Sequence, residues 1–313
     1  MKIIILSLVF IFFMDIISIH ALPRRRRSKR KSKTVSGWLD NSVEDMYKKA
    51  YDKTNINSII SGLELLVLKY PHTKYAELAQ FDIGKYCYLS ERHSRAIKEF
   101  TEFLDSFSSS YLVDKVYYFL GLSYTELFDK DNAVLCFDKI IYDSGEQSDL
   151  YAKAFMAKGD LYFKFSNFSE ALKYYNKAME NVKKQDVIIS SLYYKLGKVY
   201  QKQGQWEKSK KEFTYVLDNY PICNEAVLIK KEMNDFNVFA FSVQVGCFTS
   251  KNNAYTLKQK LEKKGYEVFV IEPIAINDKF YKVRVGRFKE KANAMELLKK
   301  IRNKEKIKAR IVP

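Results

Sequence analysis

Two polar residues occupy matched positions in a strand that the sequence contains twice. The stretch FSVQVGCF (Phe241–Phe248) returns forty residues later as YKVRVGRF (Tyr281–Phe288), so that Gln244 aligns with Arg284. A Gln amide both donates and accepts hydrogen bonds, and an Arg guanidinium forms bidentate pairs with carboxylates. These two residue types predict recognition of a polar or anionic ligand.

The rest of the sequence does not favour catalysis. The three histidines have no partners at catalytic or metal-binding spacing, and the sequence contains neither a Gly-rich phosphate loop nor a nucleophile elbow. The four cysteines are widely spaced without a Cys-x-x-Cys motif, and Cys87 and Cys136 fall within helical patterns. We therefore expect a protein that is not an enzyme, has no metal and no cofactor, and keeps these two thiols free and buried.

The two strands belong to a duplicated unit. Each shows the alternation of a β-strand and is followed by a helical pattern and a further strand. A β-α-β unit written twice predicts a β-α-β-β-α-β domain, a four-stranded antiparallel sheet with two helices on one face. The expected elements are a strand at 238–248, a helix at 250–265, strands at 266–273 and 280–288, a helix at 290–303 and a strand at 307–312.

Strand alternation assigns the side chains to the two faces of this sheet. The valines of both copies, including Val243 and Val285, are expected to pack under the helices. The opposite face, called here the helix-free face, then carries polar and basic side chains and is expected to be open to solvent. Its candidate ligand-binding residues are Ser242, Gln244, Phe269, Phe280, Lys282 and Arg284.

The C-terminal domain resembles the sporulation-related repeat (SPOR) family of bacterial division proteins. The resemblance rests on Val-Gln-Val-Gly-x-Phe, on Lys-x-Gly-Tyr before the second strand and on the restart Val-Arg-Val-Gly-x-Phe. It implies binding of peptidoglycan, specifically septal glycan strands without stem peptides, through the helix-free face. Arg284 would pair with the lactyl carboxylate of muramic acid and Gln244 with an N-acetyl amide, while Phe269 and Phe280 would stack on sugar rings. Cys247 departs from the Ala usual in the family.

A longer period organises the middle of the chain. Glycines recur at spacings of 37, 38 and 38 residues from Gly84 to Gly197, each followed twelve residues later by Ala or Ser and then by an aromatic. The two small residues let antiparallel helices approach closely, and the aromatic fills the gap beyond. One such hairpin cannot bury its apolar faces alone, so the units must stack. The pattern resembles the tetratricopeptide repeat (TPR) family and predicts an all-α solenoid over residues 42–236.

The TPR resemblance implies a scaffold for protein interactions. By the register of the family, the concave face contains Tyr88, Tyr118, Phe163 and Tyr194. These side chains either line a groove for a protein partner or pack between repeats, and the sequence favours neither. The predicted fold class is a multidomain chain, with the all-α TPR solenoid followed by a small α+β domain at 238–313.

The N-terminus predicts export. The run MKIIILSLVFIFFM is followed by Ala21, which is typical of a secretory signal peptide at 1–21 with cleavage after Ala21. The basic segment at 22–41 holds 8 basic residues and 1 acidic residue next to that run, so an uncleaved anchor is the alternative. Either reading places the protein in the periplasm or cell envelope.

Charge is concentrated at the two ends of the chain. Residues 238–313 hold 18 basic and 7 acidic residues, whereas the solenoid is close to neutral. A basic four-stranded sheet also suits RNA recognition, but YKVRVGRF lacks the aromatic-rich strand of that fold, and an exported protein is not expected to bind nucleic acid. We expect a cell-envelope adaptor that binds septal glycan and recruits an envelope or division protein. An activator of a peptidoglycan hydrolase is the alternative.

Overall fold

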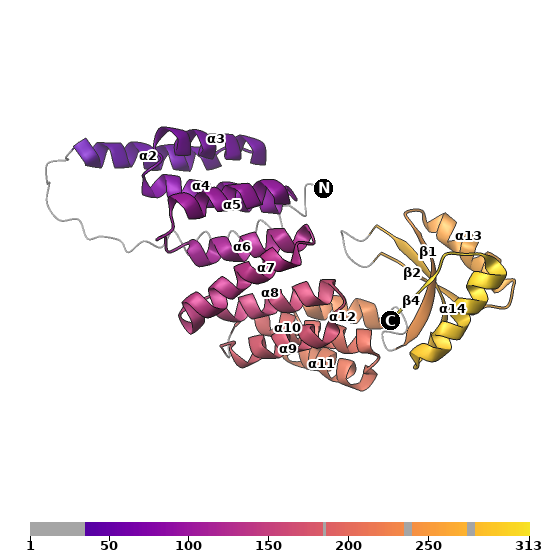
Figure 1. Ribbon diagram of the computed structural model, residues 1–313. Coiled ribbons are helices and arrows are strands. Elements are labelled where there is room, and N and C mark those ends of the chain that lie inside the picture. Colours follow the sequence, from indigo (N-terminus) through magenta and orange to yellow (C-terminus); the bar gives the residue numbers. More distant parts are fainter. Residues whose placement is uncertain (1–34, 184–185, 235–239, 274–278) are drawn as a thin grey trace.

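The computed structural model describes residues 35–183, 186–234, 240–273 and 279–313. It confirms the predicted fold class, an all-α repeat solenoid followed by a small α+β domain (Figure 1). The predicted signal sequence and the basic segment up to residue 34 lie outside the described residues. Within the described ranges, no helix is both long and apolar enough to cross a membrane.

The solenoid consists of antiparallel helix pairs stacked along one axis (Figure 1). Even-numbered helices from α2 to α12 contact one another in succession, and each of the first five pairs with the odd-numbered helix that follows it. A short π-helical turn (Lys139–Ser144) and a 3-10 turn (Gly145–Gln147) extend α7. The helices are α2 (Val35–Tyr51), α3 (Ile56–Lys69), α4 (Lys74–Leu89), α5 (His93–Ser106), α6 (Val113–Glu126), α7 (Lys130–Asp138), α8 (Tyr151–Lys164), α9 (Phe168–Glu180), α10 (Ile188–Gln203), α11 (Trp206–Asn219) and α12 (Asn224–Asn234).

The repeating glycines lie directly under the repeating aromatics, as the spacing predicts. A Cβ atom added to Gly159 or to Gly197 would lie 2.4 Å from the ring of Tyr175 or of Phe213, which is far inside van der Waals contact. The same arrangement joins Gly84 to Phe100 and Gly121 to Phe137. The glycine therefore sets the distance between the two helices of each pair, because a larger residue would force the ring out of its site.

The C-terminal domain is a sheet of strand order β2-β3-β1-β4, with every neighbouring pair antiparallel. Helices α13 and α14 cover one face, and their apolar side chains form a separate core with the strand valines. Ser250 caps α13 by accepting a hydrogen bond from the Asn253 backbone nitrogen at 3.5 Å. The elements are β1 (Phe241–Phe248), α13 (Lys251–Glu262), β2 (Val268–Ile271), β3 (Tyr281–Phe288), α14 (Lys291–Glu305) and β4 (Arg310–Val312).

The last strand is shorter than the alternation predicts. Lys306 ends α14 in the left-handed conformation, with φ of 53°, and the chain reaches the sheet only at Arg310. The Arg302 guanidinium donates a hydrogen bond of 2.7 Å to the Ala309 carbonyl, which holds this connection against the helix. The turn at Lys306 and the hydrogen bond to the Ala309 carbonyl keep residues 307–309 beside α14, so the strand begins at 310 and not at 307.

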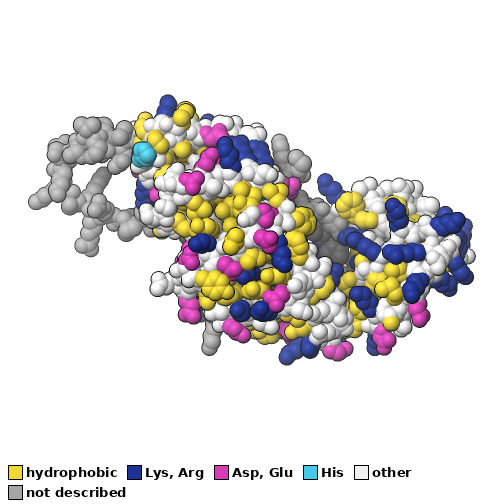
Figure 2. All heavy atoms as spheres, in the orientation of Figure 1, with side chains coloured by type: hydrophobic (Ala, Val, Ile, Leu, Met, Phe, Trp, Pro, Cys, Tyr) yellow, Lys and Arg dark blue, Asp and Glu magenta, His cyan; other side chains and the backbone are white. Residues whose placement is uncertain are grey.

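The sheet domain adjoins the last repeat of the solenoid. Figure 1 shows the strands on the side of the domain that faces the solenoid, with α13 and α14 on the far side. Figure 2 shows many Lys and Arg side chains over the sheet domain, whereas both signs of charge are interspersed over the solenoid. The arrangement therefore turns the helix-free face of a basic domain toward the solenoid.

Candidate functional site

Strand pairing brings the two matched polar residues directly opposite each other. Gln244 on β1 pairs with Arg284 on β3, Arg284 pairs with Phe269 on β2, and Gln244 pairs with Arg310 on β4. One row of side chains thus crosses all four strands of the helix-free face. The neighbouring Val243 is fully buried in the core on the opposite side, as alternation predicts.

Arg284 is the charged centre of this row. Its Nη1 atom donates a hydrogen bond of 2.8 Å to the Pro313 carbonyl, while its buried Nε atom has no hydrogen-bond partner in the structure. Burial lowers the pKa of Arg284 to about 10, and Arg310 lowers it further, whereas Glu232 of the solenoid acts in the opposite direction. The side chain remains a cation at neutral pH and has an unused hydrogen-bond donor.

The helix-free face is not open to solvent at Ser242 and Gln244, and for these two residues that expectation was wrong. Ser242 is 2% exposed and Gln244 is 9% exposed, although neither side chain points toward α13 or α14. The Ser242 hydroxyl is buried without a hydrogen-bond partner. The last repeat lies next to this face, since Lys202 on α10 is close enough to Arg284 and Arg310 for these cations to act on its pKa, and Glu232 on α12 acts on the pKa of Arg284. We attribute the burial of the two side chains to this neighbour.

Three contacts hold the two domains together at this junction. The Trp206 ring packs edge-on against the Phe241 ring with centroids 4.9 Å apart, and its Nε1 atom donates a 2.9 Å hydrogen bond to the Lys289 carbonyl. Gly204, with φ of 73°, forms the turn between α10 and α11, and a Cβ atom there would lie 2.9 Å from the Phe241 ring. The glycine thus permits both the turn and the close approach of the sheet.

Like charges also meet at the junction. Burial lowers the pKa of Lys202 to about 8, and the nearby cations Lys198, Arg284 and Arg310 lower it further. Glu232 is the one carboxylate that acts in the opposite direction on both Lys202 and Arg284. The Glu232 carboxylate also forms an ion pair with Lys198, whose Nζ atom lies 3.0 Å away. The contact between the domains therefore carries an excess of positive charge.

The remaining predicted ligand-binding residues lie around the central row. Phe269 is half-buried beneath the Arg287 guanidinium, whose carbon is 4.6 Å from the ring centroid. Phe280 is 46% exposed beside the start of β3, and Lys282 is half-buried. Their contribution to ligand binding stays a prediction.

Sequence reasoning missed two residues of this region. Arg310 continues the alternation of the last strand and could have been found by extending that pattern to β4. Lys202 has no such signal, because it lies on α10 and reaches the sheet only through the packing of the two domains.

The four predicted groove residues are half-buried on the even-numbered helices. Tyr88 packs against Phe119 of the next repeat at 5.6 Å between ring centroids, and Tyr118 lies beside the same ring at 5.9 Å. Burial raises the pKa of Tyr88 to about 12, with smaller contributions from Glu126 and Asp160. The Tyr88 contact is packing between repeats, whereas Tyr118 and Phe119 are neighbours on α6. A role in binding a partner stays a prediction for both tyrosines.

The other two predicted groove residues also have neighbours. Phe163 packs on Phe168 at 5.6 Å between centroids, and the Tyr194 hydroxyl donates a 3.1 Å hydrogen bond to Glu232. The neighbour is thus an aromatic ring for Phe163 and a carboxylate for Tyr194.

Ion pairs connect successive even-numbered helices along the solenoid. Lys195 on α10 lies 2.7 Å from Asp160 on α8, and Asp160 also accepts a 2.6 Å hydrogen bond from the buried Tyr175 hydroxyl. Lys164 on α8 is paired in the same way with Glu126 on α6, at 2.9 Å. These pairs join one repeat to the next and line the surface on which the groove was expected.

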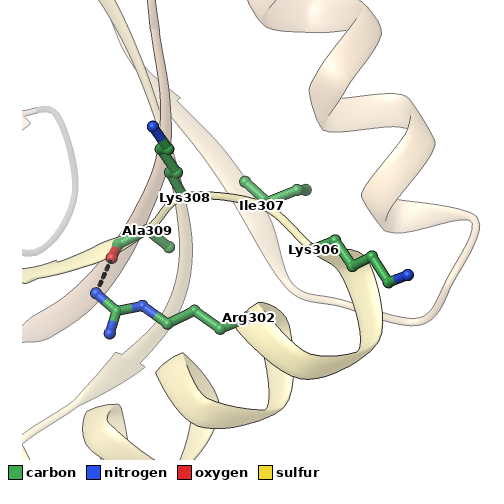
Figure 3. Close-up of a pocket in the computed structure, with 5 residues that line it drawn as sticks. All are labelled: Arg302, Lys306, Ile307, Lys308 and Ala309. Atoms are coloured by element: carbon green, nitrogen blue, oxygen red, sulfur yellow. Dashed lines mark hydrogen bonds between the residues drawn. The ribbon is translucent and has the colours of Figure 1, made fainter.

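The buried thiols and a pocket near the last strand lie apart from the central row of the helix-free face. Cys87 and Cys136 are free and buried, as expected, and burial raises the pKa of both thiols. Figure 3 shows a pocket between the end of α14 and the start of β4, where Arg302, Lys306 and Lys308 are labelled. Within the described part of the chain, no group of three or more His, Cys, Asp or Glu side chains is placed to hold a metal.

A comparison with solved structures matches the solenoid to the apo form of RapI and lists other proteins with lower TM-scores. The apo form of RapI is 14% identical, with a TM-score of 0.55, and the match covers 71% of this chain and 63% of that chain. A tetratricopeptide repeat protein from Parabacteroides merdae is 18% identical, with a TM-score of 0.48, and the match covers 62% of this chain and 74% of that chain. MamA protein is 17% identical, with a TM-score of 0.45, and the match covers 64% and 97%. At 14% identity the likeness to the apo form of RapI concerns the fold alone. A comparison with curated protein sequences found no match.

Family models divide the chain where the fold changes. Residues 39–237 match the family YfiO, described as outer membrane lipoprotein, and residues 238–313 match the SPOR domain. The matched ranges agree with the solenoid and with the four-stranded domain, and the resemblance to SPOR and repeat proteins is confirmed. The chain therefore belongs to the YfiO family of outer membrane lipoproteins, and it carries at its C-terminus a SPOR domain, a domain that implies peptidoglycan binding.

Proposed function

We propose that this protein is a non-enzymatic cell-envelope adaptor that binds denuded septal glycan through its SPOR domain and a protein partner through its solenoid. The observation that carries the proposal is the row of Phe269, Arg284, Gln244 and Arg310 across the helix-free face. The row places two cations, an amide and an aromatic ring on one line across the sheet.

The chemistry of the row suits glycan strands that have lost their stem peptides. Removal of the peptide leaves a carboxylate on each muramic acid, and a guanidinium pairs with a carboxylate through charge-assisted hydrogen bonds. Arg284 has a buried Nε donor without a partner, and Arg310 flanks the row on β4. Between them, Gln244 offers both a donor and an acceptor to an N-acetyl group.

The solenoid contributes a surface for proteins and not for glycan. Its charge is close to zero, and acidic and basic side chains alternate along the even-numbered helices. Such a surface has no excess of cations with which to attract an anionic polymer. We propose that its partner is an envelope or division protein bound along the side that contains Tyr88 and Tyr118.

The protein is proposed to act in the periplasm, with enrichment at the division septum. This placement rests on the apolar run Ile3–Met14 before Ala21 and on the glycan that the SPOR domain is proposed to recognise. Fluorescence microscopy of a tagged chain tests it. A uniform cytoplasmic signal would contradict both export and septal enrichment.

The test of glycan binding is pelleting of the full chain with purified sacculi, with and without amidase pretreatment to remove stem peptides. We expect more binding to the treated sacculi and loss of binding in Arg284→Ala. Lys299→Ala is the matched control, because Lys299 is exposed on α14, on the other side of the sheet, and its removal changes the net charge equally. Equal loss in both variants would indicate diffuse attraction to a basic domain and would contradict the proposed site.

A further inference from the structure

The last repeat covers the face on which glycan is proposed to bind. The cover is formed by the C-terminal end of α10, the Gly204 turn, the N-terminal residue Trp206 of α11 and the end of α12. Under it lie Ser242 and Gln244, which are 2% and 9% exposed. A sugar strand has to lie along the row of side chains to reach them, and their burial leaves it no access in this arrangement.

Among the residues that the structure describes, Trp206 is central to the contacts of the cover. On the solenoid side, Trp206 makes both the ring contact with Phe241 and the hydrogen bond to the Lys289 carbonyl. Interfaces between domains of one chain commonly resemble transient protein interfaces, so relative motion of the two domains is the default expectation. The hydrophobic core of the SPOR domain is separate from the solenoid cores, so the two domains can part without exposing either core.

The charges at the cover oppose its closure. Lys202 of the solenoid faces Arg284 and Arg310 of the sheet, and these cations repel one another across the junction. Glu232 offsets this repulsion in part, but it also pairs with Lys198. An anionic ligand would attract Arg284 and Arg310 once they are uncovered, whereas Lys202 repels them.

We infer that the junction is an autoinhibitory contact, in which the last repeat blocks the glycan face and must separate from it before the SPOR domain can bind. The inference rests on the proposed function of that face. The closed arrangement is held by Trp206 and weakened by the repulsion between Lys202 and the sheet arginines. Glycan binds the open form only, so the measured affinity is the intrinsic affinity reduced by the fraction of open molecules.

Two substitutions on the solenoid are expected to change the fraction of open molecules in opposite directions, and neither alters a residue of the SPOR domain. Trp206→Ala removes the ring contact and the hydrogen bond and is expected to raise the affinity of the full chain for amidase-treated sacculi by about tenfold. Lys202→Glu replaces repulsion by attraction to Arg284 and Arg310 and is expected to lower that affinity by about three- to tenfold. Lys210→Glu is the control, since Lys210 is exposed on α11 and the change in net charge is the same.

Tryptophan fluorescence reports on the junction independently of glycan pelleting. The chain has 2 Trp, so Trp206 is the only one in a Trp38→Phe variant. Addition of amidase-treated glycan should shift the Trp206 emission to longer wavelength as the ring leaves Phe241 for water, and Lys202→Glu should reduce the shift at equal glycan concentration. Circular dichroism confirms that each variant is folded.

The outcomes distinguish a failure of the autoinhibitory contact from a failure of the proposed glycan site. If the wild type binds treated sacculi and both Trp206→Ala and Lys202→Glu bind equally well, the last repeat does not block the glycan face, and the proposed function stands. If no variant binds, the proposed function fails and the inference fails with it. Opposite changes in the two variants, with Lys210→Glu equal to the wild type, support the cover.

Discussion

Gly197 lies against the edge of the Phe213 ring, so that a Cβ atom added to the glycine would be 2.4 Å from the nearest ring carbon. The ring is 1% exposed and packs between α10 and α11, so it cannot move away without opening the helix pair. This contact recurs in four units and sets the spacing of the solenoid helices.

Gly197→Ala is therefore expected to destabilise the solenoid. Forcing an additional carbon into a packed core costs about 1–3 kcal/mol in the free energy of unfolding, which outweighs the higher helix propensity of Ala. Chemical denaturation followed by circular dichroism measures the change. The double variant with Phe213→Leu is the control, because a smaller side chain frees the space and the cost of Ala should become smaller. An equal cost in both backgrounds would show that the ring contact does not set the helix spacing.

Asp160→Ala is expected to destabilise the solenoid through Tyr175. The Tyr175 hydroxyl is in a buried side chain and donates to Asp160 at 2.6 Å, so the substitution leaves this hydroxyl without its acceptor. An unsatisfied buried donor costs about 1–3 kcal/mol, and the lost ion pair with Lys195 adds less because that pair is partly exposed. Thermal unfolding gives the size of the effect. In a Tyr175→Phe background the same substitution should cost much less, and an undiminished cost would mean that another contact is responsible.

Much of this fold could be predicted because it repeats. The Gly and aromatic positions of the solenoid and the Val alternation of the sheet each follow a fixed spacing, and a fixed spacing fixes which side chains share a face. That argument correctly placed Val243 and Val285 under the helices and Gln244 and Arg284 on the opposite face.

The junction could not be predicted in the same way. The contacts of Trp206 with Phe241 and Lys289 join residues from two domains, and no period in the sequence connects them. Alternation shows which face of a strand a residue occupies but not what covers that face. For this reason the sequence placed Ser242 and Gln244 on the correct side of the sheet and still predicted the wrong exposure.

Glycan binding is expected to weaken as the pH rises from 7 to 9. Burial and neighbouring cations lower the pKa of Lys202 to about 8 in the closed arrangement, whereas an exposed lysine keeps the ordinary value of 10.5. Below pH 8 the ammonium is charged in both arrangements and opposes closure, and above pH 8 the closed form releases the proton. Closure is therefore favoured at higher pH.

The charged groups that face Lys202 are Lys198, Glu232, Arg284 and Arg310. The pKa of Lys202 lies within this pH range, so Lys202→Gln should flatten the pH dependence of sacculus binding. A pH dependence that is unchanged in Lys202→Gln would assign the effect to another group.

Glu232→Gln is expected to increase glycan binding. Its carboxylate is the negative charge that offsets the cations on both sides of the junction, and its removal leaves their repulsion uncompensated. Pelleting with treated sacculi should show a several-fold increase in affinity. Asp218→Asn removes an equal charge from an exposed site on α11 and should have little effect. An increase of the same size in Asp218→Asn would show that the effect comes from net charge and not from the position of Glu232.

The central claim is that Arg284 recognises the carboxylate of denuded glycan. The most direct measurement is the binding of wild type, Arg284→Ala and Lys299→Ala to amidase-treated sacculi, each also in the Trp206→Ala background where the face is uncovered. A hydrogen bond to a charged group is worth about 1.5–3 kcal/mol, so Arg284→Ala should weaken binding by about 10- to 150-fold in both backgrounds, while Lys299→Ala stays near the wild type. If Arg284→Ala in the uncovered chain binds treated sacculi as tightly as its parent, the helix-free face does not read the glycan and the account is wrong.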